Sequence, residues 1–169
     1  MTRNPLNWSF RIHCLLGALA CGGLLAYALY VEHGMLMQPC PLCILQRIAF
    51  LAVGLVCLVG AIHGPRRAGV RAVYGVLAAI SAIVGAAIAA WHVRMQLLPP
   101  DEVPSCGGME LGYMVKAFPL RTVIDKVFTG SGDCAKIDWT FLGVSMPGWT
   151  LLCFVLLATA ALYAGFRRR

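Results

Sequence analysis

Four long apolar runs constrain the fold of this chain more than any other feature of its sequence. Of the 169 residues, 60% are hydrophobic and only 12% are charged, about half the charged share of a typical soluble domain. Each run has about the 17–25 residues that a helix needs to cross a bilayer, and a helix satisfies its own backbone polar groups in lipid. The sequence therefore predicts an all-α membrane protein, a four-transmembrane-helix bundle forming one integral membrane domain over residues 1–169. The expected spans are about 12–31, 44–62, 72–90 and 149–166.

The basic residues are distributed unevenly around these runs. Of the 14 cationic residues, eight flank the start of the first run, the connection between the second and third, and the end of the fourth, with no acidic residue among them. The other six cations share the opposite side with all seven acidic residues. The positive-inside rule therefore places both termini in the cytoplasm and leaves two outer loops, at about 32–43 and 91–148. The eight are Arg3, Arg11, Arg66, Arg67, Arg71, Arg167, Arg168 and Arg169.

This distribution also explains the net charge of +7. The arginines are scattered at helix ends, where they face the lipid bilayer surface, so we expect no nucleic-acid partner.

The second outer loop contains one stretch with helical periodicity, "PLRTVIDKVF" at 119–128. Its apolar residues repeat at i, i+3, i+4, i+7 and i+8, which predicts a short helix with one apolar face. Arg121 and Lys126 flank that face. The helix therefore either lies on the membrane surface or packs against the top of the bundle. The apolar residues are Leu120, Val123, Ile124, Val127 and Phe128.

The eight cysteines fall into two classes. Four lie within the apolar runs, where a thiol acts as a small hydrophobic group: Cys14, Cys21, Cys57 and Cys153. The other four lie on the outer side, where an oxidising compartment favours disulfides: Cys40, Cys43, Cys106 and Cys134. The natural pairings are Cys40 with Cys43 and Cys106 with Cys134. The second pair also fits a purely structural role, since closing so long a loop stabilises a fold by roughly 3–4 kcal/mol.

The pair Cys40–Cys43 closes almost no loop, so a structural role explains it poorly. Two such cysteines serve better as a redox couple or as metal ligands. A zinc site built from all four outer cysteines remains an alternative, although Cys106 and Cys134 lack the spacing of zinc ligands.

A charge accompanies this pair at the mouth of the second apolar run. Cys43 falls at about the expected helix start, where the unpaired amides and the helix dipole favour a thiolate. Arg47 lies one turn deeper on the same face. A cation inside a membrane helix marks a functional site by default, although Arg47 is also close enough to the helix end to reach the lipid headgroups. A thiolate beside a cation at the membrane edge suits a lipid-soluble electron acceptor such as a quinone.

Four stretches resemble the bacterial disulfide bond formation protein B (DsbB) family. They are "QPCPLCILQR" (38–47), "HVRMQL" (92–97), "SGDCA" (131–135) and "WTFLGVSMPGW" (139–149). The resemblance extends over nearly the whole chain, and the paired cysteines with these flanks are highly specific.

The resemblance implies a quinone-dependent thiol oxidase of the bacterial inner membrane, a protein-disulfide:quinone oxidoreductase. Such a protein reoxidises a periplasmic DsbA-like thiol oxidase and passes the electrons to membrane quinone, either ubiquinone or menaquinone. No metal belongs to this scheme.

The same resemblance implies a role for each matching residue. Cys106 and Cys134 would meet the partner, and Cys40 and Cys43 would reduce the quinone. All four would be catalytic, while Arg47 and His92 would bind the quinone cofactor.

Other interpretations stay open on the sequence alone. Related homologues serve dedicated oxidases with narrow substrates, so the partner can differ. A non-catalytic membrane protein with structural disulfides or a zinc site is the alternative from another class. A four-helix arrangement like that of vitamin K epoxide reductase is also compatible, but the motif flanks do not point there.

Overall fold

The computed structural model of the chain describes residues 9–34, 39–98, 119, 135, 137 and 139–167. Apart from Pro119, the short helix predicted at 119–128 lies outside these residues, and so do Cys106 and Cys134.

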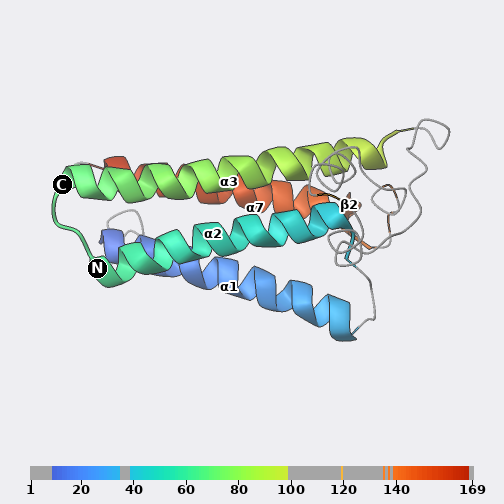
Figure 1. Cartoon of the computed structure of the whole chain (residues 1–169), viewed down its shortest axis with the longest axis horizontal. Coiled ribbons are helices and arrows are strands. Elements are labelled where there is room, and N and C mark those ends of the chain that lie inside the picture. The colour runs from blue at the N-terminus through green and yellow to red at the C-terminus, as the bar shows by residue number, and fades with distance from the viewer. Residues whose placement is uncertain are drawn as a thin grey trace.

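In the part of the chain that the structure describes, four long helices form a bundle, as the sequence predicts (Figure 1). They are α1 (Phe10–Gly34), α2 (Pro41–His63), α3 (Ala68–Gln96) and α7 (Met146–Phe166). Even the shortest has 21 residues, which at 1.5 Å per residue is about the 30 Å thickness of the hydrocarbon core. All four are long and apolar enough to cross a membrane, so the chain is a multi-pass membrane protein.

The helices lie side by side in one bundle, with α3 packed along both α7 and α2, and α1 along α2 (Figure 1). The start of α1, the connection between α2 and α3, and the end of α7 lie at one end of the bundle. The start of α2 and the end of α3 lie at the other. Toward its own C-terminal end, α1 diverges from α2.

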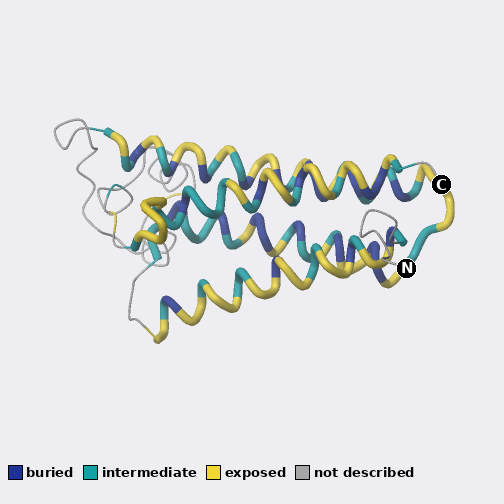
Figure 2. Tube along the Cα trace, turned by 180° about the vertical axis from the view of Figure 1, so that it is seen from behind, coloured by how far each residue is buried: buried dark blue, intermediate teal, exposed yellow. Residues whose placement is uncertain are grey.

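Apolar side chains cover the outside of the bundle as well as its interior. Figure 2 shows exposed residues along the outer faces of the helices. Many are large and hydrophobic, such as Leu19 with 63% and Ile62 with 71% of its surface exposed. A soluble protein does not expose so much apolar surface, whereas a lipid-facing helix does.

The core is built on an aromatic stack between α2 and α7. The rings of Phe50 and Phe154 lie 3.9 Å apart at 13° to each other, and both side chains are buried. On α3, small residues allow α7 to approach closely. Gly85 is required here, because a Cβ at this position would overlap the Phe154 ring.

The four cysteines of the apolar runs lie within the bundle. Cys14, Cys21 and Cys57 are buried and Cys153 is half-buried. Between α1 and α2, Cys14 packs beside Gly60 and Cys57 packs beside Gly17. These thiols therefore pack in the core, at a distance along the helices from the outer pair.

A small hairpin precedes α7, and the sequence analysis did not predict it. Strands β1 (Thr140–Phe141) and β2 (Val144–Ser145) pair antiparallel around Leu142 and Gly143. These two residues have φ of 52° and 78°, the two positive values of a type I′ turn.

Two hydrogen bonds tie the hairpin to the helices. Trp149 Nε1 donates to the carbonyl of Phe141 over 3.1 Å, and Ser145 Oγ donates to Gln96 Oε1 over 2.6 Å. The hairpin thereby holds the first turn of α7 against the last turn of α3.

Candidate active site at the start of α2

Helix α2 begins earlier than the apolar run suggests. Its first residue is Pro41, whose fixed φ suits the first helical position, and Cys40 is the N-cap with φ −69° and ψ 162°. The Cys43 amide donates to the Cys40 sulfur over 3.4 Å. The sequence analysis expected the helix to start at about Cys43. In the structure Cys40 occupies the cap, so the unpaired amides of the first turn face the Cys40 side chain.

The two cysteines of this pair face each other across the first turn. Their Sγ atoms lie 3.1 Å apart, and both side chains are half-buried. The pair can therefore pass between dithiol and disulfide with little backbone movement.

A buried histidine from α3 lies beside the pair. His92 is only 3% exposed, and its Nε2 lies 3.8 Å from the Cys40 sulfur. An imidazole at this position can accept the thiol proton and stabilise the resulting thiolate. The packing of α3 against α2 thus brings together residues 52 positions apart in the sequence.

The same three residues also form a set of soft donors. The ligand atoms of Cys40, Cys43 and His92 all lie within 4.8 Å of one another. Thiolates and imidazole are the ligands of zinc, so this set is compatible with a zinc site as well as with redox chemistry.

Behind His92 lie two polar residues that the sequence analysis missed. Gln46 is 4% exposed, and its Nε2 lies 3.1 Å from His92 Nδ1. Thr150, in the first turn of α7, donates to Gln46 Oε1 over 2.6 Å. The available signal was the glutamine itself, since an amide inside a membrane helix needs a partner when buried.

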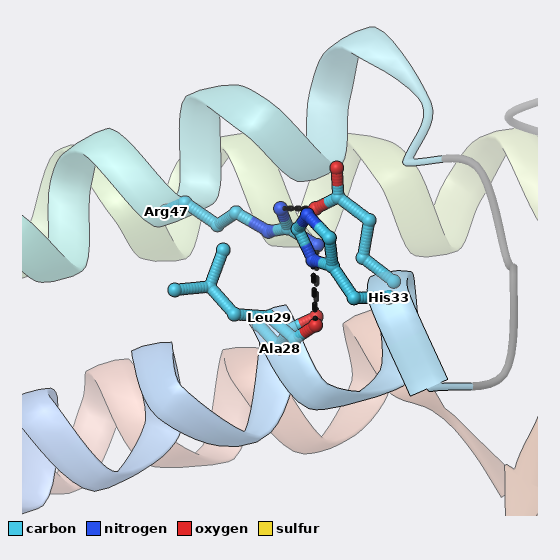
Figure 3. Close-up of polar contacts among 5 residues, drawn as sticks. Ala28, Leu29, His33 and Arg47 are labelled. Carbon is cyan, nitrogen blue, oxygen red and sulfur yellow. Dashed lines mark hydrogen bonds and ion pairs between the residues drawn. The ribbon is translucent and has the colours of Figure 1, made fainter.

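Arg47 reaches away from α2 toward the last turns of α1 (Figure 3). Its guanidinium forms an ion pair with the Glu32 carboxylate and donates to the Ala28 carbonyl over 3.2 Å. The same figure shows His33 beside this contact, where its Nδ1 lies 3.0 Å from the Leu29 carbonyl. The sequence analysis counted Glu32 only as an outer acidic residue. The structure makes it the partner of Arg47.

The fold and the site together define an integral membrane protein with a capped cysteine pair at one helix start, a geometry that suits thiol–disulfide exchange. The family model described as "Disulfide bond formation protein DsbB" matches residues 10–164. The chain belongs to the DsbB family, as the sequence motifs indicated.

Relatives named "Disulfide bond formation protein B" match this chain over most of their length. The protein of Xanthomonas campestris pv. campestris (strain 8004) is 54% identical over 166 residues, which are 98% of this chain and 96% of the relative. The protein of Azoarcus sp. (strain BH72) is 50% identical over 150 residues, 88% of each chain. That of Methylococcus capsulatus is 51% identical over 154 residues, 91% of this chain and 93% of the relative. Membership in this family makes the chain a disulfide-forming oxidoreductase.

Proposed function

We propose that this protein is a quinone-dependent thiol oxidase that reoxidises a periplasmic DsbA-like partner. The observation that carries the proposal is the Cys40–Cys43 pair at the mouth of a membrane helix, with His92 3.8 Å from the Cys40 sulfur. A half-buried pair at this position can exchange with a thiol from the aqueous side and still lie within reach of a lipid-soluble acceptor.

Electrons would enter through the loop pair. The thiolate of the reduced partner attacks Cys106 in the Cys106–Cys134 disulfide, and Cys134 leaves as a thiolate. The second thiolate of the partner then resolves this mixed disulfide, which releases the oxidised partner and reduced Cys106.

The cysteine pair of α2 would accept those electrons by the same chemistry. The Cys134 thiolate attacks Cys40, and Cys43 leaves as a thiolate in the first turn of α2. Cys106 then attacks Cys134, restores the loop disulfide and releases Cys40, to which His92 returns a proton. The α2 pair now holds two electrons more than its disulfide form.

The residues present fit a quinone headgroup by the chemistry of their donors. Arg47 offers N–H groups from a side chain that is 24% exposed, and His92 presents Nε2 beside Cys40. When bound, ubiquinone or menaquinone would accept the two electrons and two protons whose loss restores the Cys40–Cys43 disulfide. Arg47 would orient the headgroup and favour negative charge on its oxygen atoms.

The orientation in the membrane follows from the charges. Of the described residues, five arginines lie at the end where α1 starts and α7 finishes: Arg11, Arg66, Arg67, Arg71 and Arg167. Glu32 and the cysteine pair lie at the opposite end. The proposal places the arginine-rich end and both termini in the cytoplasm and the site at the periplasmic face of the bacterial inner membrane.

Quinone reduction by the purified protein in lipid nanodiscs tests the proposal. A reduced DsbA-like protein and a water-soluble ubiquinone or menaquinone analogue are added, and the loss of quinone absorbance is recorded. We expect turnover that needs all three components and stops in Cys40→Ser and Cys43→Ser. Trials with several thiol partners would show whether one dedicated oxidase is preferred.

A zinc site is the second candidate, favoured by the Cys40, Cys43 and His92 donor set. Elemental analysis of the same preparation separates the two. Stoichiometric zinc that His92→Ala removes, without quinone turnover, would contradict the oxidase and support the metal site.

A further inference from the structure

We propose that Gln46 and Thr150 are positioning residues, which hold the His92 ring with Nε2 directed at the Cys40 sulfur. The role of His92 at Cys40 rests on the proposed thiol oxidase. The positioning itself rests on a chain of contacts that joins three helices.

The contacts run from α7 through α2 to α3 and back to the cysteine. Thr150 Oγ1 lies 2.6 Å from Gln46 Oε1, and Gln46 Nε2 lies 3.1 Å from His92 Nδ1. On the far side of the ring, Nε2 lies 3.8 Å from Cys40 Sγ. Gln46 and His92 are 4% and 3% exposed, so water does not compete for these groups.

The hydrogen positions follow from the single proton of the Thr150 hydroxyl. When it donates to Gln46 Oε1, the amide NH₂ faces His92 Nδ1, and the neutral ring carries its proton on Nε2. The hydroxyl also lies 2.9 Å from the Pro147 carbonyl. When it donates there, the amide can reverse, donate to Thr150 and accept from Nδ1–H. Reversal of the amide only exchanges its nitrogen and oxygen between the same two positions, so the ring direction is held for either tautomer.

The rest of the fold fixes both ends of this chain of contacts. The hairpin holds Thr150, because Ser145 donates to Gln96 at the end of α3 and Trp149 donates to Phe141. Gln46 follows Cys43 by three positions on the helix that carries the cysteine pair. The distance between the imidazole and the sulfur is therefore set by helix packing and by one amide.

Thr150→Val is the sharpest test, because valine keeps the shape of threonine and removes only the hydroxyl. We expect it to slow quinone turnover, and alkylation of reduced Cys40 by iodoacetamide, by about 3–10-fold each. Thr150→Ser, which retains the hydroxyl, should return both rates to within about twofold of the unmodified protein. Peptide mass spectrometry of the full-length protein in nanodiscs reports the Cys40 alkylation rate.

Thr159→Val is the matched control, since Thr159 is an exposed residue of α7 whose hydroxyl donates to the carbonyls of Val155 and Leu156 in its own helix. It should change neither rate. If Thr150→Ser fails to restore the rates, packing rather than the hydroxyl is responsible, and the proposal is wrong.

A double-mutant comparison shows whether Thr150 acts through the histidine. In a His92→Ala background, adding Thr150→Val should change the alkylation rate by less than twofold, because the positioned group is gone. An equal slowing in both backgrounds would overturn the proposal. Alkylation requires no quinone, so these arms decide the positioning role even if the unmodified protein fails to reduce quinone and the proposed oxidase is wrong.

Discussion

Arg47 of α2 is joined to Glu32 of α1 by an ion pair at the end of the bundle that carries the cysteine pair. The side chains keep 24% and 28% of their surface exposed, so the pair is partly accessible from outside the bundle. The contact bridges two helices that diverge toward this end. Arg47 therefore does more than extend to the headgroups, since its charge is placed by a partner on the neighbouring helix.

Substitution of Arg47 should impair quinone reduction. Arg47→Ala removes the cation that favours negative charge on the quinone oxygens, and we expect a loss of at least tenfold in kcat/KM for quinone. Arg47→Lys keeps the charge but loses the planar fork, so it should retain partial activity. Arg94→Ala is the control, because Arg94 is exposed on α3 and stacks 5.2 Å over the Trp91 ring. Unchanged kinetics in Arg47→Ala would leave an anchoring role for this arginine.

Neutralising Glu32 should strengthen quinone binding, the opposite of the effect expected for Arg47→Ala. Glu32→Gln keeps an acceptor for the Arg47 guanidinium but removes the negative charge that offsets it. Because the pair is partly exposed, we expect a modest effect, a decrease of about 2–5-fold in KM for quinone. Steady-state rates over a range of quinone concentrations measure it. A rise in KM would show that the carboxylate is needed to hold Arg47 in place.

Replacement of Gly85 by alanine should destabilise the bundle. The new Cβ would overlap the Phe154 ring, which is stacked on Phe50 and has no room to move. Overpacking of this kind costs about 1–3 kcal/mol. Gly22→Ala is the matched control on α1, since a Cβ there meets no atom within 4 Å. Thermal unfolding in detergent should show a lower Tm for Gly85→Ala but not for Gly22→Ala. Equal Tm values for the two variants would mean that α3 and α7 can move apart without loss of stability.

The helices were predictable because a helix that crosses lipid requires a long apolar run in the sequence. Runs such as 44–62 are apolar on every side, so their existence and order follow from composition and length. Their ends were less clear. α3 continues through His92 and Arg94, since polar residues at a helix end leave the apolar run without ending the helix.

The contacts of the site were harder to foresee for the same reason. A run that is apolar all round does not show which face meets a neighbouring helix, so the approach of Gln46 to His92 and of Arg47 to Glu32 could not be read from it. The hairpin was missed because Leu142 occupies a left-handed position without the usual Asn-Gly signal. His92 was found through its motif, whereas Thr150 had no signal of its own.

Reporter fusions should reveal the orientation of the bundle. The positive-inside rule places the connection at Arg67 and the C-terminus after Arg169 in the cytoplasm, and the loop around Glu110 in the periplasm. An alkaline phosphatase fusion should therefore be active near Glu110 and inactive at the other two sites. Fluorescent protein fusions, which mature in the cytoplasm, provide the complementary control. Phosphatase activity at Arg67 would reverse the proposed topology.

The two cysteine pairs should fail in different ways when each is broken. Cys106→Ser should block oxidation of the DsbA-like partner, yet quinone should still oxidise Cys40 and Cys43 after chemical reduction, because these two face each other at 3.1 Å without help from the loop. Cys43→Ser should abolish quinone reduction, yet a mixed disulfide at Cys106 should still be trapped with a partner that lacks its second, resolving cysteine, since the loop pair is intact. Cys153→Ser, in a half-buried thiol of α7, controls for the loss of any one cysteine. Thiol counting after quinone addition and non-reducing gel electrophoresis distinguish the variants, and full turnover in both would make the pairs structural.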